Sequence, residues 1–507
     1  MKNTLTQSMA WLHTWAGLIF GWLLFAIFAT GTLAVFDKEI DNWMRPEVRS
    51  HDLSQAQAAQ RALAWLKLHA PNASAWNISL PDARSPGLQV SSGERRRGGG
   101  TQLDPHTGEP VDVRQTAGGN FFFRFHFTLN LPRNWGIFMV GALAIVMLVG
   151  LVSGIVIHKK IFKEFFTFRP DKGQRSWLDF HNASAVLLLP FHLMITYTGL
   201  VIFLFIYMPA AVDVLFDGDH RAYYNAQGEQ RLKTPREALK QPAELADLAP
   251  VLAQAQQRLG SISGINISNP GTAAARIEVR PTLGYRIALS KGQAMVFDGV
   301  SGQLLRDVPD MQPAVLTQRV MSGLHFAQFG GYPMRWLYFL CGLISSAMIA
   351  SGLVLFCVKR RRKYASASAS ARRWYAVAER FNVAFVAGLM LACVGLPWAN
   401  RLLPVDLAHR ADWEVKLFFG VWLLSLLHAA WVPVQRAWVG QLGLAALLCI
   451  ALPLLGLLTA VPDPAHRALE ATSVVLGLLL AYTAWRCSAP RDEIKPLRRS
   501  ATPGEAR

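Results

Sequence analysis

The sequence predicts a membrane all-α bundle of about eight transmembrane helices with two small α+β domains outside the bilayer. Three observations carry this prediction. Hydrophobic residues make up 52% of the chain and charged residues only 17%, where a soluble chain carries roughly 25%. Eight segments are apolar over about 20 residues, the length that crosses the hydrocarbon layer. An internal tandem repeat also relates the first four of these segments, each pair enclosing a long polar stretch.

The expected elements follow one another along the chain. They are a helix in 1–36, a soluble domain in 37–133, a helix in 134–157, a basic loop in 158–179, a helix in 180–208, a soluble domain in 209–334, a helix in 335–358 and a basic linker in 359–376. A four-helix membrane domain occupies 377–487, with helices expected at 377–398, 413–432, 440–460 and 467–487, and a tail follows in 488–507.

The net charge of +18 is concentrated beside the apolar segments. Basic clusters follow the second helix, the fourth helix and the eighth helix, which is the pattern of cytoplasmic loops. Both termini are therefore expected in the cytoplasm of a bacterial cell, the chain in its inner membrane, and the segments 37–133 and 209–334 in the periplasm. No aromatic and basic surface typical of nucleic-acid binding occurs outside these clusters, so nucleic acid is not an expected partner.

The five cysteines lie within or at the end of apolar segments and are not spaced as C-x-x-C. They are expected to be small hydrophobic side chains rather than disulfides, zinc ligands or iron–sulfur ligands. The two soluble domains contain no cysteine and must fold without disulfides. Because C-x-x-C-H does not occur, covalent c-type haem attachment is excluded.

The repeat places histidines at corresponding positions. His13 in the first helix and His181 in the third are each followed, eighteen residues later, by a Thr-Gly glycine, Gly31 and Gly199. His126 precedes the second helix and His325 precedes the fourth. Both units enter the membrane from the cytoplasm, so their symmetry axis should run along the membrane normal. The turns Asp104–Glu109 and Asp298–Gln303 also correspond, each after a helix-like segment.

This symmetry would bring His13 opposite His181 near the cytoplasmic face and His126 opposite His325 near the outer face. Two pairs of imidazoles are what two stacked b-type haems require as axial ligands, so we expect two haem b groups. His192 is a competing ligand for the outer pair, or a proton carrier, because it lies about 1100° after His181 on a helix and shares its face. His158 is a further candidate inner ligand or an interfacial residue.

Alternatives remain for these side chains. A histidine near a helix end can simply be an interfacial polar residue, whereas ionisable residues within membrane segments are functional by default. A non-haem metal site would call for carboxylates or thiolates, and the nearest is Asp179, which could instead orient His181. Arg124 and Arg175 are candidate partners of haem propionates or surface charges. The aromatic residues at 121–127 could pack on a porphyrin or form an interfacial belt, and several glycines could admit a macrocycle or pack helices, namely Gly17, Gly21, Gly154, Gly199 and Gly352.

Several motifs resemble the PepSY-associated transmembrane helix family over residues 1 to about 360. They are LHTWAGL at 12–18, SGIVIHKK at 153–160, FFTFRP at 165–170, DFHN at 179–182, LPFH at 189–192 and TGL at 198–200. The resemblance implies PepSY-like soluble domains and a relationship to iron-regulated inner-membrane proteins and ferric-siderophore reductases. It further implies two histidine-bound b-type haems and reduction of a ferric siderophore or another ferric chelate at the periplasmic face. Residues beyond about 375 lie outside it.

Other function classes stay open alongside this electron-transfer and oxidoreductase hypothesis. A PepSY-type regulatory or binding protein would use the helices as anchors. A transporter for iron or siderophore would need polar residues facing a cavity in the last four helices, where His428, Arg380 and Asn382 are the chief candidates. The electron donor would be a quinol or a cytoplasmic reductase, because no nucleotide-binding motif occurs in the chain.

Overall fold

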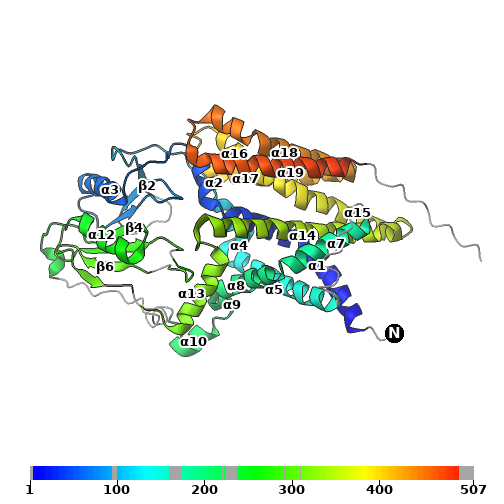
Figure 1. Cartoon of the computed structure of the whole chain (residues 1–507), viewed down its shortest axis with the longest axis horizontal. Coiled ribbons are helices and arrows are strands. Elements are labelled where there is room, and N and C mark those ends of the chain that lie inside the picture. The colour runs from blue at the N-terminus through cyan, green and yellow to red at the C-terminus, as the bar shows by residue number, and fades with distance from the viewer. Residues whose placement is uncertain are drawn as a thin grey trace, which may run out of the picture.

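A computed structural model describes residues 4–93, 100–158, 173–219, 222, 237–284, 286–290, 293–308 and 310–489. The basic residues expected in the loop after the second helix (159–172), the loop Arg95–Arg97 and most of the C-terminal tail lie outside these residues. Figure 1 shows a bundle of long helices with a β-sheet at one end, called here the sheet end. The N-terminus lies toward the opposite end of the bundle.

Among the described residues, seven continuous helices are long and apolar enough to cross a membrane, and an eighth span results if one bent pair counts as a single crossing. The chain is therefore a multi-pass membrane protein. The continuous spans are Leu5–Ala34, Arg133–Ile157, Gly331–Arg361, Ala369–Leu402, Arg410–Trp431, Val434–Thr459 and Pro464–Ser488. The bent pair is Gln174–Leu187 with Leu189–Ile202. These eight segments match the predicted ones to within several residues at each end.

The first membrane unit is built on α1 (Leu5–Ala34), which begins at a capping box formed by Thr4 and Gln7. It packs against α5 (Arg133–Ile157) and against α14 (Gly331–Ala365). Two short helices lie between α1 and α5 at the sheet end, α2 (Asp37–Trp43) and α4 (Asn120–Thr128). His126, which precedes the second predicted membrane helix, therefore lies on a short helix of its own.

The third span is broken. Helix α7 (Gln174–Leu187) and helix α8 (Leu189–Ile202) meet at an angle of 64°. Leu188 and Pro190 stand at the break, and a proline lacks the N–H that would continue the helix. The expectation that His181 and His192 share one face of a straight helix is wrong for this reason. Two short helices, α9 (Leu204–Tyr207) and α10 (Ala210–Phe216), complete this part.

The two soluble segments contribute strands to one seven-stranded antiparallel sheet. Its spatial order is β3 (Thr101–Leu103), β2 (Leu88–Ser92), β1 (Ala75–Ser79), β4 (Ile262–Ser268), β5 (Arg276–Pro281), β6 (Met295–Asp298) and β7 (Leu304–Arg306). The segments meet at β1 and β4, where Asn77 stands opposite Asn266. The amide of Asn266 donates a hydrogen bond of 2.7 Å to the side-chain oxygen of Asn77. Both asparagines belong to an Asn-Ile-Ser sequence.

The core of this sheet lies under two helices, α3 (Gln55–His69) and α12 (Leu248–Leu259). Alternate strand residues such as Trp76, Ile78 and Ile277 are buried against them, as expected for a half-covered antiparallel sheet. The predicted turns are confirmed: the Asp104 and Asp298 carboxylates accept backbone N–H groups two residues on, at 2.7 and 3.0 Å. A short η1 (Ala238–Lys240) precedes α12, and α13 (Pro313–Phe326) leads back to α14.

The C-terminal helices lie beside α1 and α14 (Figure 1). Helix α15 (Ala369–Asn382) continues through a π-helical turn, η2 (Val383–Gly388), into α16 (Leu389–Leu402). Helices α17 (Arg410–Trp431), α18 (Val434–Thr459), the short η3 (Pro464–His466) and α19 (Arg467–Ser488) follow. Asn382 joins this group to α1, because its side-chain oxygen accepts a hydrogen bond of 2.8 Å from the indole N–H of Trp22.

Candidate functional site

Two pairs of histidines lie between the helices of the first membrane unit. His13 of α1 and His181 of α7, the far pair, have ring centroids 6.3 Å apart and ring planes at 76°. His126 of α4 and His325 of α13, the sheet-side pair, have centroids 6.0 Å apart and planes at 35°. The structure thus brings together the histidines that the sequence predicts to face one another.

All four rings are held through the same nitrogen. Nδ1 of His13 contacts the carbonyl oxygen of Gly150 at 2.9 Å, and Nδ1 of His181 contacts that of Met348 at 2.9 Å. In the sheet-side pair, the acceptors are the Ile27 carbonyl for His126 at 2.8 Å and the Ile195 carbonyl for His325 at 2.9 Å. A carbonyl only accepts, so each Nδ1 carries the proton. In the neutral imidazole Nε2 is then the unprotonated nitrogen, the form that binds a metal.

Hydroxyl groups reinforce three of these contacts. Ser153 lies 3.1 Å from Nδ1 of His13 and Ser351 lies 3.3 Å from Nδ1 of His181. Thr198 lies 3.2 Å from Nδ1 of His325. The orientation of each ring is therefore fixed by neighbouring membrane helices, which is how proteins set the direction and tautomer of ligating histidines.

A glycine lies against each of the four rings. A Cβ atom on Gly31 would lie 2.5 Å from Nδ1 of His126, and one on Gly199 would lie 2.9 Å from Cε1 of His325. A Cβ on Gly352 would lie 2.9 Å from Cε1 of His181, while Gly154 leaves 3.4 Å to Cε1 of His13. These glycines admit the imidazoles between closely packed helices. Gly17 and Gly21 play no such part: Gly17 faces open space and Gly21 faces Leu353.

The two pairs lie at different depths. His13 and Ile27, whose carbonyl holds His126, are fourteen residues apart on α1, a separation of about 20 Å along the axis. The hydrocarbon layer is about 30 Å thick, so this separation corresponds to about two-thirds of its thickness. His181 and Ile195, the corresponding residues of α7 and α8, are also fourteen residues apart in sequence.

His192 belongs to neither pair. It is fully buried, and its Nε2 lies 2.9 Å from the Ser345 hydroxyl. Ser345 lies three residues before Met348 on α14, on the sheet side of the far pair. His192 therefore stands between the levels of the two pairs, with Phe28 at 6.4 Å between ring centroids.

The remaining predicted site residues lie elsewhere. His158 ends α5, its backbone N–H donating 3.0 Å to the Gly154 carbonyl, and among the described residues no contact joins its side chain to the far pair. Arg124 and Arg175 are exposed. Of the aromatic residues at 121–127, Phe121 and Phe125 pack against Phe418 of α17 rather than between the histidines.

The donor set of the pairs suits a porphyrin. When two histidines bind one metal from opposite sides, the distance between their ring centroids is the sum of two metal–Nε2 bonds, each about 2.0 Å, and two distances from Nε2 to the ring centroid. This sum is about 6 Å. Both observed separations, 6.3 and 6.0 Å, match this geometry. Within the described part of the chain, no third His, Cys, Asp or Glu completes a protein-only metal cluster. An equatorial ligand supplied by a cofactor would complete each two-histidine set.

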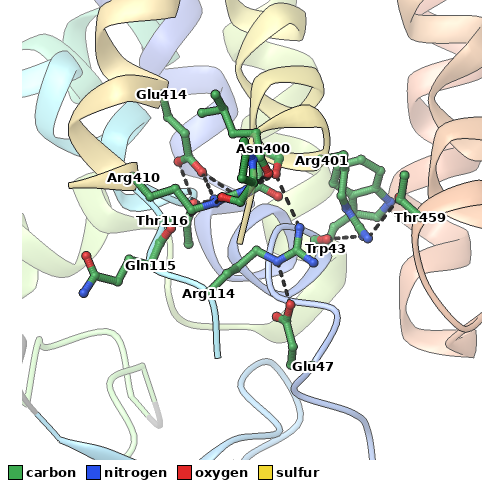
Figure 2. Close-up of polar contacts among 12 residues, drawn as sticks. Trp43, Glu47, Arg114, Gln115, Thr116, Asn400, Arg401, Arg410, Glu414 and Thr459 are labelled. Atoms are coloured by element: carbon green, nitrogen blue, oxygen red, sulfur yellow. Dashed lines mark hydrogen bonds and ion pairs between the residues drawn. The ribbon is translucent and has the colours of Figure 1, made fainter. Parts of the chain in front are cut away.

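The sequence interpretation missed a cluster of buried charges at the sheet end of the C-terminal helices. Arg410 and Glu414 of α17 are fully buried, and Arg401 of α16 is 7% exposed. Arg401 donates to the Trp43 carbonyl and lies 4.2 Å from the Trp43 ring centroid (Figure 2). Ionisable residues at the ends of apolar segments, four apart on a helix, were the signal that could have pointed to this cluster.

Comparisons with known proteins agree with the span of the first membrane unit. The family described as PepSY-associated TM region matches residues 10–360. A relative in Pseudomonas aeruginosa, named Uncharacterized protein PA4219, is 25% identical over 379 residues, which cover 69% of this chain and 91% of the relative. Because the family match spans more than half of the chain and includes all four paired histidines, the chain belongs to the PepSY-associated TM family.

Proposed function

We propose that this protein carries electrons across a bacterial inner membrane through two histidine-bound b-type haems and delivers them to a ferric chelate, such as a ferric siderophore, at the sheet end. The observation that carries the proposal is the presence of two imidazole pairs, 6.3 and 6.0 Å between centroids, with every Nδ1 bonded to a backbone carbonyl. The pairs are about 20 Å apart in depth, which suits stepwise transfer between two leaflets.

His13 and His181 would hold one haem, and His126 and His325 the other. A haem so bound supplies reversible one-electron chemistry at iron, tuned by its ligands and their surroundings. The chain fixes the imidazoles in advance through the carbonyls of Gly150, Met348, Ile27 and Ile195, so no proton has to leave Nε2 when a metal binds. The buried apolar residues of the surrounding helices would exclude water from a haem held there.

The arrangement of the chain supports an internal tandem repeat with the sheet in the periplasm. Each unit supplies one helix over the sheet and one aspartate-capped turn. Each also supplies one histidine on a membrane span and one on a helix at the sheet end, α4 or α13. The two soluble segments, 37–133 and 209–334, are proposed to be the PepSY-like domains. Basic clusters outside the sheet end, such as Lys359–Lys363, favour the cytoplasm on the other side and hence both termini there.

The substrate would be a ferric chelate bound at the sheet end, near His126 and His325. Hard oxygen ligands hold ferrous iron less tightly than ferric iron, so reduction would release the metal. The electron donor on the cytoplasmic side is proposed to be a quinol or a separate reductase, because the sequence has no nucleotide-binding motif.

The test is an absorption spectrum of the purified, detergent-solubilised protein after expression with sufficient haem. We expect a Soret band, α and β bands on reduction, and about two haems per chain. His13→Ala or His181→Ala should remove one haem, and His126→Ala or His325→Ala the other. A chain without a Soret band would rule out the electron-transfer function and favour a regulatory or binding role.

A further inference from the structure

A buried ion pair lies at the sheet end of α17. Arg410 and Glu414 are one helical turn apart, their charged groups are 2.5 Å apart, and both side chains are 0% exposed. Charges removed from water in this way persist only when further hydrogen bonds satisfy them. Their remaining partners therefore reveal what the pair is built to hold.

Three of those partners belong to a distant part of the chain (Figure 2). The others, Asn400, Leu403 and Pro404, lie at the end of α16 and in the loop that leads to α17. Glu414 accepts from the Thr116 hydroxyl at 2.7 Å and from the Ala117 backbone N–H at 2.8 Å. Arg410 donates to the Gln115 carbonyl at 3.0 Å. Three consecutive residues, 115–117, are thus bound by two charged side chains of the C-terminal helices.

Asn400 at the end of α16 completes the attachment. The side-chain NH2 group of Asn400 donates to the Thr116 hydroxyl at 3.0 Å and to the Glu414 carboxylate at 2.8 Å. The backbone carbonyl of Asn400 accepts from Arg410 and from Arg114. Asn400 is fully buried as well. The segment therefore lies in a dry polar site, where each lost partner leaves another group unsatisfied.

The bound segment leads directly into α4, the helix that carries His126. Gly118 and Gly119 follow it and pack so closely on α2 that a Cβ atom at either position would overlap Asp41 or the Asp37 carbonyl. In α4 itself, the ring centroid of Phe121 lies 4.7 Å from that of Phe418, and the ring centroid of Phe125 lies 5.8 Å from it. Helix α4 is therefore held between α1, α2 and α17.

The partner histidine is held in another way. His325 lies on α13, which packs on α8. Earlier in α13, the Arg319 carbonyl accepts a hydrogen bond of 2.9 Å from the backbone N–H of Leu289, which ties the helix to the second soluble segment. The Tyr338 hydroxyl donates 2.6 Å to the Leu324 carbonyl. The two ligands of the sheet-side pair thus depend on different supports.

We infer that the C-terminal four-helix domain, which lies beyond the family match, is a positioning domain for the sheet-side histidine pair, with Glu414 and Arg410 fixing the entry into α4. The inference rests on the proposed function in that His126 is a ligand. It assigns to the last four helices the role of fixing the position of the His126 imidazole in the sheet-side pair.

The main test replaces the ion pair as a unit, with Arg410→Leu and Glu414→Leu together, so that no uncompensated charge stays buried. Hydrogen–deuterium exchange of the full-length protein is followed in peptides covering 115–128 and, as internal control, 313–326. We expect exchange in 115–128 to rise about tenfold, because several hydrogen bonds to backbone groups are lost, while 313–326 is unchanged. Gln441→Leu is the matched control, since Gln441 is also buried in this domain and its amide donates to Ser425 and contacts His428, both on α17.

The second readout is the electron paramagnetic resonance spectrum of the oxidised protein. Low-spin ferric haem reports the angle between its axial imidazole planes, so sites at 35° and 76° should give distinct signals. The double variant should shift or broaden the sheet-side signal and its midpoint potential and leave the far-pair signal in place. Equal changes in both signals, or in neither, would contradict a positioning role.

A milder pair of variants serves if the double variant does not fold. Thr116→Ala removes the hydroxyl bonded to Glu414, and Thr116→Ser restores it, so the first should loosen 115–128 and the second should recover the normal exchange. Unchanged exchange in Thr116→Ala would overturn the inference. If the wild-type protein binds no haem, the proposed function fails while the exchange measurements still decide whether the C-terminal domain holds α4.

Discussion

Gly31 lies directly against the imidazole of His126: a Cβ atom on the glycine would be 2.5 Å from Nδ1 of the histidine. A contact this short cannot be tolerated, and the ring cannot withdraw without losing its bond to the Ile27 carbonyl. The glycine and the carbonyl, four residues apart on α1, therefore define the position of the ring from two directions. Similar contacts at the other three histidines make substitution of these glycines a graded test of the proposed sites.

We predict that Gly31→Ala weakens haem binding at the sheet-side pair about 10–100-fold, the range typical of changes that disturb the orientation of a ligand. The measurement is haem content per chain together with a redox titration. Gly17→Ala, on the same helix and facing open space, should leave both sites intact. Loss of haem in both variants would point to a general fault in α1 instead.

The far pair offers its own comparison between equivalent glycines. Gly352→Ala should disturb His181, because the added Cβ would approach to 2.9 Å, whereas Gly154→Ala leaves 3.4 Å to His13 and should have a smaller effect. We expect the midpoint potential of the far site to move in the first variant and to stay close to its normal value in the second. The reverse order would show that the ring positions differ from those described.

His192→Ala should retain both haems. Its Nε2 is engaged by Ser345, and it lies between the two levels rather than opposite His126 or His325. The competing arrangement, in which His192 replaces one member of the sheet-side pair, predicts that His192→Ala loses a haem while His126→Ala keeps its full content. Spectra of the two variants, each normalised to protein, separate these cases.

A pH-dependent contact ties the sheet to the bundle. Burial alone would raise the pKa of Glu39, but hydrogen bonds and charge from Arg84 outweigh it and hold the pKa below its ordinary value. A carboxylate with a lowered pKa stabilises the folded state fully above its unfolded pKa of about 4.3, and this stabilisation is lost as the pH falls through the folded value. Thermal unfolding of the wild type at a series of acidic pH values should show this loss as a falling melting temperature.

Glu39→Gln is the control for this contact, because it removes the ionisable group and keeps an acceptor for Arg84 and Tyr332. The variant should be less stable near neutral pH and should lose less stability on acidification than the wild type. An equally steep acid dependence in both proteins would mean that other carboxylates, such as Asp463, control the transition.

Membrane orientation is tested separately from haem. Cysteine or reporter insertions at Ser301, in the turn between β6 and β7, and at Ser368, at the start of α15, should respond from opposite sides of the membrane. The structure places the strands at one end of the bundle, and the basic linker precedes α15. The same response at both positions would exclude a periplasmic sheet.

The sequence was informative where the signal was local or repeated. Hydropathy located the spans, and the recurrence of His13 as His181 and of His126 as His325 predicted which rings face one another, because both copies keep the same spacing to their glycines. The turns at Asp104 and Asp298 were equally clear, since a short acidic side chain caps its own turn.

Long-range pairing was not predictable in this way. Nothing in the local sequence of β1 states that Asn77 will pair with Asn266 rather than with a strand of its own segment. The break at Leu188 follows from Pro190, but its angle depends on the helices packed around it. Arg410 and Glu414 lay at the edge of an apolar segment, and only the fold shows that their partners are residues 115–117.

The pairing of β1 with β4 has a consequence for the synthesis and membrane insertion of the protein. Strand β1 is synthesised before α5, α7 and α8 are inserted, and its partner β4 emerges only after them. Until then one edge of β1 is open, and an open strand edge can pair with other chains. The first soluble segment therefore reaches its final partner only if two later spans insert correctly, so a stalled insertion would expose it to proteases and chaperones outside the membrane.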